Sequence, residues 1–397
     1  MDSNQNKLLN LLQEIHDICE ELNILYVLGG VTAEEADVFG TLAPERYTAV
    51  VYMTLKDFSE FKRYISYNKE EDRVIEGLDN NHRFPGFFFR YVDKNTTYYD
   101  YNYGNTYICN GINVRIEILR KYCTPKQCKK LVQRERGFAF NSYRYKRKIS
   151  AKSNALKIAT GFKLFFARKS MAKKLYSDCV DKYFETKDFV PCYGIYNRKR
   201  TKLVKYPSYL LTGRRLVEFE GHNLYVPKDI AKHVKTVLGR AVGSNPYEPI
   251  NNSTVVVSDI TPYEEYIKDL RERHKIAKLR RKIRVADKMH GAVTYHIRKD
   301  WKIIEAVNAR LDMINLYMPQ KAEIIKLYQK GEFEALTPIF EEYDNTVKEH
   351  LSRAKKTLFF DKDIYDVYIA WLGETGQGKY VKKMNKFIPK EWKNSRD

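Results

Sequence analysis

The chain has 397 residues, enough for about two or three domains of ordinary size and a sizeable buried core. Hydrophobic residues make up 43% and aromatic residues 14%, which excludes an intrinsically disordered chain. Lysine and arginine outnumber aspartate and glutamate by 71 to 50, a formal net charge of +21. This excess fits nucleic acid, an anionic membrane surface, a polyanionic glycan or a nucleotide-sugar as partner, and it does not choose among them.

The cysteines and the hydropathy of the chain predict a cytoplasmic protein. No two of the six cysteines stand in the C-x-x-C spacing of a zinc or redox site. The N-terminal residues run directly into an amphipathic helical pattern, and no stretch approaches about 18 uncharged apolar residues. We therefore expect neither a signal peptide nor a membrane span, and contact at most with the inner face of a membrane.

The first 120 residues predict a mixed α/β sheet flanked by helices. Apolar residues between Leu8 and Leu22 recur at helical spacing. Gly29 and Gly30 follow the first expected strand directly. Apolar and β-branched runs place strands at 24–28, 47–53, 87–92 and 112–119, with a helix at 55–65.

A segment without any acidic residue follows this sheet. Residues 136–174 contain twelve lysines and arginines, and Phe162, Phe165 and Phe166 are interleaved with them. One interpretation is a surface that lies on anionic lipid headgroups. The other is an ordinary helix pair with phenylalanine in the core and lysine outside. Nucleic acid is not expected as a partner, because no recognition motif accompanies the charge.

Composition and pattern divide the chain into four parts. Residues 181–260 carry turns, short strands and a helix, and long charged helical patterns follow, beginning with a second basic run at 271–284. The predicted parts are a core at 1–135, a basic helical insertion at 136–180, the remainder of the first domain at 181–260 and a helical C-terminal region at 261–397.

Five segments between residues 5 and 250 resemble, in order, successive blocks of one family. They are LLQEIHDICEELNILYVLGG, PERYTAVVYMTLKDFSEF, RYVDKNTTYYD, NGINVRIEIL and FEGHNLYVPKDIAKHVKTVLGRAVGSNP. On these blocks the chain resembles the LicD family of phosphocholine transferases, which includes the fukutin-type enzymes. The resemblance implies an α/β (α+β) fold: a nucleotidyltransferase-like mixed sheet with a helical insertion and a helical C-terminal region.

The resemblance also implies where a metal site would lie. In that family an acidic cluster precedes an M-x-x-x-D-[FY] motif and a further aspartate lies on a later strand, and these carboxylates bind Mg²⁺. The chain keeps the frame in Pro44, Met53, Asp57 and Phe58. The positions of the cluster are occupied by Arg46, Tyr47, Thr48 and Val50, that of the later aspartate by Arg115, and a further family acid is replaced by Arg240.

These replacements change the chemistry that the site predicts. Two oxygen ligands of one metal ion on a strand must lie at i and i+2, and Thr48 and Val50 offer a single neutral oxygen there. Arginines at such positions would instead hold phosphate by fork-like hydrogen bonds without a metal. The predicted phosphate- or nucleotide-binding residues are Gly29, Gly30, Arg46, Thr48 and Arg115.

A displaced carboxylate site is the alternative, and it alone would bring Mg²⁺ as a cofactor. It would consist of Glu117 with an acid from the loop after the glycine pair: Glu34, Glu35 or Asp37. Glu117 and Asp37 are then the catalytic candidates. The competing interpretation pairs Glu117 with Arg115 on the same strand face and leaves the loop acids solvated or capping a helix.

Two functions remain open at this point. The resemblance implies a protein of cell-surface glycan decoration (capsule, lipopolysaccharide or teichoic acid) that transfers phosphocholine or a similar phospho-alcohol from a CDP-alcohol donor. The replaced acids favour a catalytically degenerate relative that binds an anionic nucleotide or glycan as a scaffold or regulator. The expected partners are a CDP-alcohol or other nucleotide, an anionic or lipid-linked glycan, and a membrane surface through residues 136–174.

Overall fold

The computed structural model describes residues 2–68, 71–100, 107–121, 125–142, 151–182, 188–190, 205–243, 255–267, 309–389 and 392. The chain divides into two compact units, Met1–Glu264 and Glu265–Asp397, which are described separately. The division falls close to the predicted start of the helical C-terminal region at residue 261. The basic run at 271–284 lies outside the described residues.

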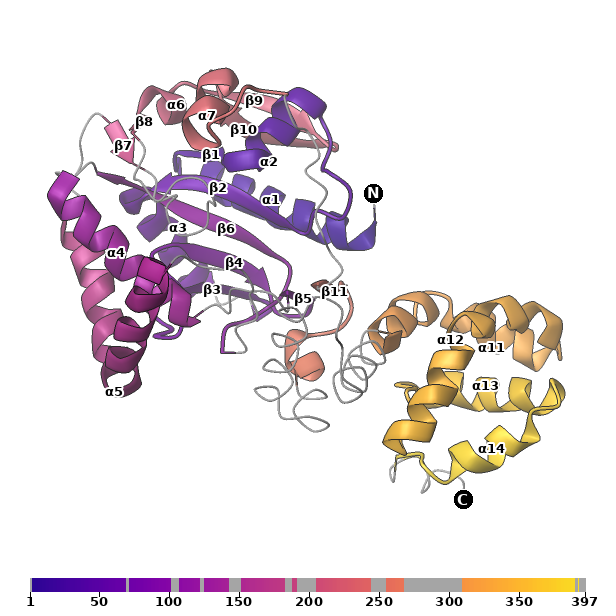
Figure 1. Cartoon of the computed structure of the whole chain (residues 1–397). Coiled ribbons are helices and arrows are strands. Elements are labelled where there is room, and N and C mark those ends of the chain that lie inside the picture. The colour runs from indigo at the N-terminus through magenta and orange to yellow at the C-terminus, as the bar shows by residue number, and fades with distance from the viewer. Residues whose placement is uncertain are drawn as a thin grey trace. The chain divides into compact units, whose positions relative to one another are not determined.

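A seven-stranded mixed sheet, of which five strands form the main path, lies at the centre of the first unit (Figure 1). In spatial order the strands of this path are β1 (Tyr26–Leu28), β2 (Thr48–Thr54), β6 (Asn113–Lys121), β4 (Phe89–Asp93) and β3 (Arg73–Gly77). The β2–β6 pair is parallel and the other three pairs are antiparallel. The predicted mixed sheet is confirmed, while β3 was not anticipated.

Helices α1 (Ser3–Glu21) and α3 (Leu55–Asn68) cover one face of this sheet. Asp2 and Gln5 form a reciprocal capping box that satisfies backbone N–H groups at the start of α1. Successive strand residues point to opposite faces, so one face carries only every second side chain. On the covered face these side chains are apolar and join those of α1 and α3 in the main core: Ala49, Val51, Met53, Val114, Ile116 and Ile118.

The opposite face of the sheet is polar at its centre. It carries Thr48, Val50 and Tyr52 from β2 and Asn113, Arg115 and Glu117 from β6, because register partners on paired strands share a face. Shorter elements assemble at the β1 edge: α2 (Gly30–Glu34), the π-helix η1 (Glu35–Phe39), α6 (Tyr209–Thr212), β9 (Arg214–Phe219), β10 (His222–Pro227) and α7 (Ile230–Val237). The segment expected as a loop after the glycine pair is therefore helical. The remaining two strands of the sheet are β7 (Asp188–Val190), which pairs with the end of β6, and β8 (Tyr206–Pro207), which pairs with β7.

Two antiparallel helices, α4 (Pro125–Ser142) and α5 (Ala151–Lys182), pack side by side next to the sheet. A methyl group added to Gly137 would come within 2.4 Å of the Thr160 hydroxyl, so the two backbones approach closely there. The Asn141 amide also donates to the Lys157 carbonyl across the pair, at 3.1 Å. The helix pair begins at Pro125, earlier than the boundary at residue 136 that the charge pattern suggested.

The first unit also contains two separate two-stranded sheets, one of β9 and β10 and one of β5 (Thr97–Asp100) and β11 (Val255–Ser258). Strand β5 pairs with β11, and the Thr97 hydroxyl donates to the Thr261 carbonyl at 2.7 Å. Within the described residues no helix is long and apolar enough to cross a membrane.

The second unit is helical, as predicted. Its helices α11 (Lys321–Gln329), α12 (Phe333–Ala354), α13 (Lys362–Glu374) and α14 (Gly378–Asn385) enclose a core around Trp371. The sequence G-x-x-x-x-G-K at 373–379 spans the end of α13, the turn that follows and the start of α14, whereas a phosphate-binding loop of that pattern follows a strand.

Candidate functional site

The glycine pair forms a tight turn between β1 and α2. The Gly29 N–H donates to the Val50 carbonyl of β2 at 2.7 Å, and the Gly30 N–H donates to the Tyr52 hydroxyl at 3.2 Å. A Cβ atom on Gly29 would lie 2.4 Å from the Tyr52 ring, which leaves no space for a side chain. Gly30 has a φ of +54°, a left-handed conformation that favours glycine. The turn can therefore pack against β2 only with glycine at both positions.

A buried aromatic cluster lies against this turn. The rings of Tyr52, Tyr206 and His233 are mutually 5.5 to 5.7 Å apart between centroids, and the Tyr206 hydroxyl hydrogen-bonds His233 Nδ1 at 2.9 Å. Burial lowers the pKa of His233 to about 4, so the imidazole is neutral near pH 7. Burial also raises the pKa of Tyr206. This cluster was missed in the sequence, where His233 has the appearance of an isolated histidine.

The carboxylates of α2 and η1 each contact an arginine. Glu34 is buried and binds both terminal nitrogens of Arg240, at 2.8 and 2.5 Å, and accepts the Gly243 N–H at 2.8 Å. Glu35 is buried and accepts from Nε and Nη2 of Arg46, at 3.0 and 2.7 Å.

The third acid of this segment, Asp37, forms an ion pair with Arg215 of β9. Burial raises the pKa of Glu35, and the charge of Arg46 opposes that rise. The predicted alternative of solvated loop acids is therefore wrong for Glu34 and Glu35.

A row of charged residues crosses the polar face of the sheet. Glu76, Arg90, Arg115 and Val50 are register partners on β3, β4, β6 and β2. Arg90 binds Glu76 at 2.9 Å, and Arg115 forms an ion pair with Glu117, as one interpretation of the sequence predicted. Together with Glu117, two positions further along β6, the row holds two arginines and two glutamates, so the formal charges cancel. Arg90 and Glu76 each stand among apolar residues of a strand, and this pattern in the sequence could have identified them.

Further contacts fix Arg115 and Glu117 within this row. The Arg115 guanidinium lies 3.8 Å from the centroid of the Phe88 ring, a cation–π contact. Glu117 is buried, which raises the pKa of its carboxyl, while the charges of Arg115 and Arg120 oppose that rise. These contacts hold the Glu117 carboxylate beside Arg115.

The residues at the implied metal positions do not fit Mg²⁺. Thr48 and Val50 share the polar face, and the register partner of Val50 is Arg115, a cation. Through the described part of the chain, no three His, Cys, Asp or Glu side chains form a group that could hold a metal ion. The catalytic candidates Glu117 and Asp37 therefore do not belong to a displaced carboxylate cluster of that size.

The predicted phosphate-binding residues occupy one region around β2. Gly29 and Gly30 are bound to Val50 and Tyr52, Arg46 precedes the strand and Thr48 begins it, and Arg115 lies on the adjacent strand β6. Tyr47, at one of the metal-binding positions that the resemblance implies, is nearly buried and donates a hydrogen bond to Asp2 of the α1 cap at 2.9 Å. It serves the packing of α1.

Scanned against family models the chain gives no match, and no curated protein matches it.

Proposed function

We propose that the first unit is a nucleotidyltransferase-like domain of the LicD type that binds a phosphate-bearing nucleotide or glycan without a metal. In this proposal it acts as a cytoplasmic scaffold or regulator of cell-surface glycan decoration and does not itself transfer a phospho-alcohol. One observation carries the proposal: Glu34, Glu35, Asp37 and Glu117 are each held by an arginine. Carboxylates engaged in this way are poor ligands for Mg²⁺, which requires oxygen donors in near-octahedral geometry.

Arginine chemistry supports anion binding at the same place. A guanidinium has five N–H donors, and the bonds from Arg46 to Glu35 engage Nε and Nη2. Arg46 therefore retains donors for a phosphate oxygen while it stays paired with Glu35. Since phosphate and guanidinium match each other in bidentate geometry, this contact depends on arginine and not on charge alone.

Isothermal titration of the full chain with CDP-choline and with CTP, in the presence and absence of Mg²⁺, tests this function. We expect binding that does not depend on Mg²⁺. The substitutions Arg46→Lys and Arg115→Lys keep the charge and remove the fork, and each should weaken binding about tenfold. Arg73→Lys is the matched control, because the Arg73 side chain is 17% exposed and paired with Glu14, much as Arg46 is 19% exposed and paired with Glu35.

A turnover assay separates this proposal from an active phosphocholine transferase. The same protein is incubated with CDP-choline, a glycan acceptor and Mg²⁺, and released CMP is measured. Release of CMP that requires Mg²⁺ would overturn the non-catalytic role. Unchanged binding in both Arg→Lys variants would place the nucleotide elsewhere on the chain.

A further inference from the structure

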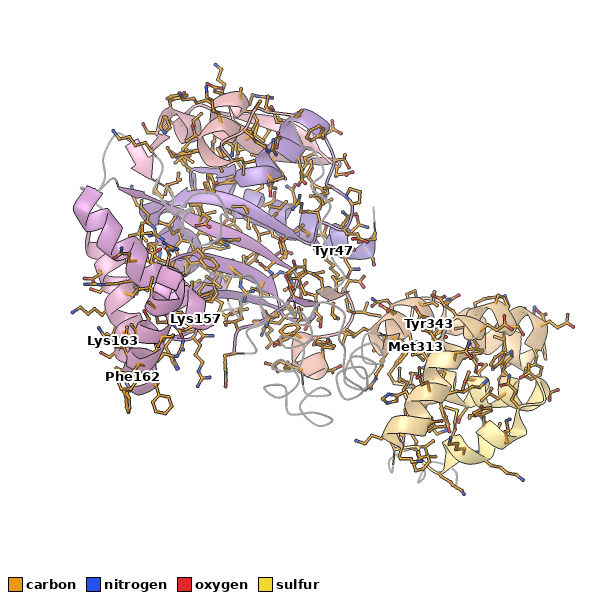
Figure 2. The ribbon with its side chains drawn as sticks, viewed as in Figure 1. Tyr47, Lys157, Phe162, Lys163, Met313 and Tyr343 are labelled. Carbon is orange, nitrogen blue, oxygen red and sulfur yellow. The ribbon has the colours of Figure 1, made fainter. Side chains whose placement is uncertain are left out.

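Helix α5 carries an apolar stripe that faces solvent. Ile158, Phe162, Phe165 and Phe166 follow the i, i+4, i+7, i+8 spacing of one helix face, and their exposed fractions are 68%, 71%, 83% and 73%. Large apolar side chains are rarely exposed in such a contiguous group unless they meet a partner. Figure 2 shows Phe162 at one end of the α4–α5 pair, near Lys157 and Lys163.

The fold does not require this stripe. A different face of α5 packs inward, with Leu164, Ala172, Leu175 and Cys179 buried in the main core. The α4–α5 contact is also fixed independently, by the close approach at Gly137 and by the Asn141 bond to Lys157. The solvent-facing stripe is therefore a second apolar face on an already packed helix.

The three phenyl rings form one exposed group. Phe166 contacts Phe162 at 5.4 Å and Phe165 at 5.0 Å between ring centroids, both edge to face. Ala167, which follows them directly, departs from helical geometry with φ −134° and ψ 34°, so α5 bends there. The rings of Phe162, Phe165 and Phe166 thus stand together next to a bend as a compact apolar knob.

The helix that carries this knob is rich in exposed cations. Lys163, Lys169, Lys173 and Lys174 are exposed on the same helix, and residues 136–174 contain no aspartate or glutamate. Arg83, Arg168 and Lys169 also lie near His82, and burial together with these cations lowers the pKa of His82. The surface therefore combines protruding apolar groups with a local excess of cations.

We propose that this face of α5 docks on the surface of an anionic phospholipid bilayer. The phenyl rings enter the boundary between headgroups and acyl chains, and the lysines and arginines bind lipid phosphates. This face and the candidate site share no residues, so this proposal does not depend on the proposed function.

Charge complementarity favours a bilayer over other occupants. A second copy of the chain in a symmetric dimer would bring identical cationic surfaces together, which costs repulsion. Bases of nucleic acid stack on open aromatic faces, whereas these rings contact one another edge to face. A bilayer with anionic headgroups accepts both the apolar knob and the charges around it.

Co-sedimentation of the full chain with lipid vesicles tests the proposal. Vesicles of phosphatidylcholine with a third of phosphatidylglycerol should bind the protein, and vesicles of phosphatidylcholine alone should not. The triple variant Phe162→Ser, Phe165→Ser, Phe166→Ser should lower the partition coefficient by about tenfold or more. Tyr67→Ser removes an aromatic side chain that is 86% exposed on α3 and should bind like the wild type.

Depth of insertion gives a second readout. In the variant Phe165→Trp, tryptophan emission should be quenched by vesicles that contain brominated anionic lipid, and that of the wild-type tryptophans should not. Absence of binding to anionic vesicles, or equal binding by the triple variant, would overturn the proposal. The proposal would also be overturned if the protein bound no vesicles but formed a dimer, or bound an oligonucleotide, and the triple variant abolished that association.

Discussion

The candidate site and the exposed face of α5 are both rich in cations, yet their electrostatics differ. At the candidate site Arg46, Arg115, Arg215 and Arg240 each form an ion pair with a carboxylate. On α5, by contrast, the helix that carries the phenyl rings also exposes Lys163, Lys169, Lys173 and Lys174, and segment 136–174 contains no acid. Since an ion pair adds nothing to the net charge of +21, the excess has to come from regions such as segment 136–174, which has twelve cations and no acid.

Burial explains the difference. A charge removed from water loses several kcal/mol of solvation and persists only beside an opposite charge, whereas an exposed lysine keeps its hydration. An arginine in a mostly buried site therefore requires a carboxylate partner. Glu34 and Glu35, both fully or almost fully buried, have that role here.

The largest effect is expected from Arg46→Gln. This change leaves the Glu35 carboxylate buried without its guanidinium partner, so the free energy of unfolding should fall by about 3 kcal/mol near neutral pH. Because loss of Arg46 raises the pKa of Glu35 further, the deficit should grow as pH rises above the ordinary glutamate range. Urea denaturation at several pH values measures it.

Two further variants sharpen this result. The double variant Arg46→Gln, Glu35→Gln removes the buried charge and should recover most of the loss. Arg134→Gln breaks the more exposed pair with Asp178 on the α4–α5 helices and should change stability by less than about 1 kcal/mol. Equal losses in Arg46→Gln and Arg134→Gln would contradict the contrast between the two regions.

A smaller, pH-dependent effect is expected at His233. Its pKa is about 4 in the folded chain and near 6.5 when exposed, so the unfolded state binds the proton first as pH falls. From pH 8 to pH 5 this group alone should remove about 2 kcal/mol of stability. His233→Gln does not titrate, so the difference between the two pH profiles isolates the effect; parallel profiles would show that His233 is accessible to protons.

The smallest effect on stability is expected on α5. Lys163→Gln combined with Lys169→Gln changes exposed side chains, and the free energy of unfolding should stay within about 0.5 kcal/mol of the wild type. Binding to anionic vesicles should nevertheless weaken about thirtyfold, since each of the two cations contributes roughly 1 kcal/mol near such a surface. A stability loss comparable to that of Arg46→Gln would mean that these lysines support the fold.

Local patterns predicted the main elements, whereas the chemistry of the site depends on distant partners. The helical spacing of Leu8 to Leu22 and the alternation at 112–119 correspond to α1 and β6. The pairing of Glu34 with Arg240 joins residues 206 positions apart, and neither side chain has a local signal that names the other. The sequence allowed the Arg115–Glu117 pair to be predicted, because both residues lie on one strand, but it could not show which carboxylates would neutralise Arg46 and Arg240.

Strand β3 and the His233 cluster were missed for a related reason. Arg73–Gly77 is short and carries two charged residues, so its strand character depends on its pairing with β4. His233 acquires its lowered pKa from burial against Tyr52 and Tyr206, which come from other elements. Both features arise from tertiary packing and leave no periodicity in the sequence.

The pairing of β5 with β11 has a consequence for synthesis on the ribosome. Thr97–Asp100 emerges about 155 residues before Val255–Ser258, its antiparallel partner. At about 5–20 residues per second the earlier strand waits roughly 8 to 30 seconds for that partner. An unpaired strand edge can pair with another chain during such an interval. Nascent chains that stall between these two strands are therefore the ones most exposed to aggregation and to capture by chaperones.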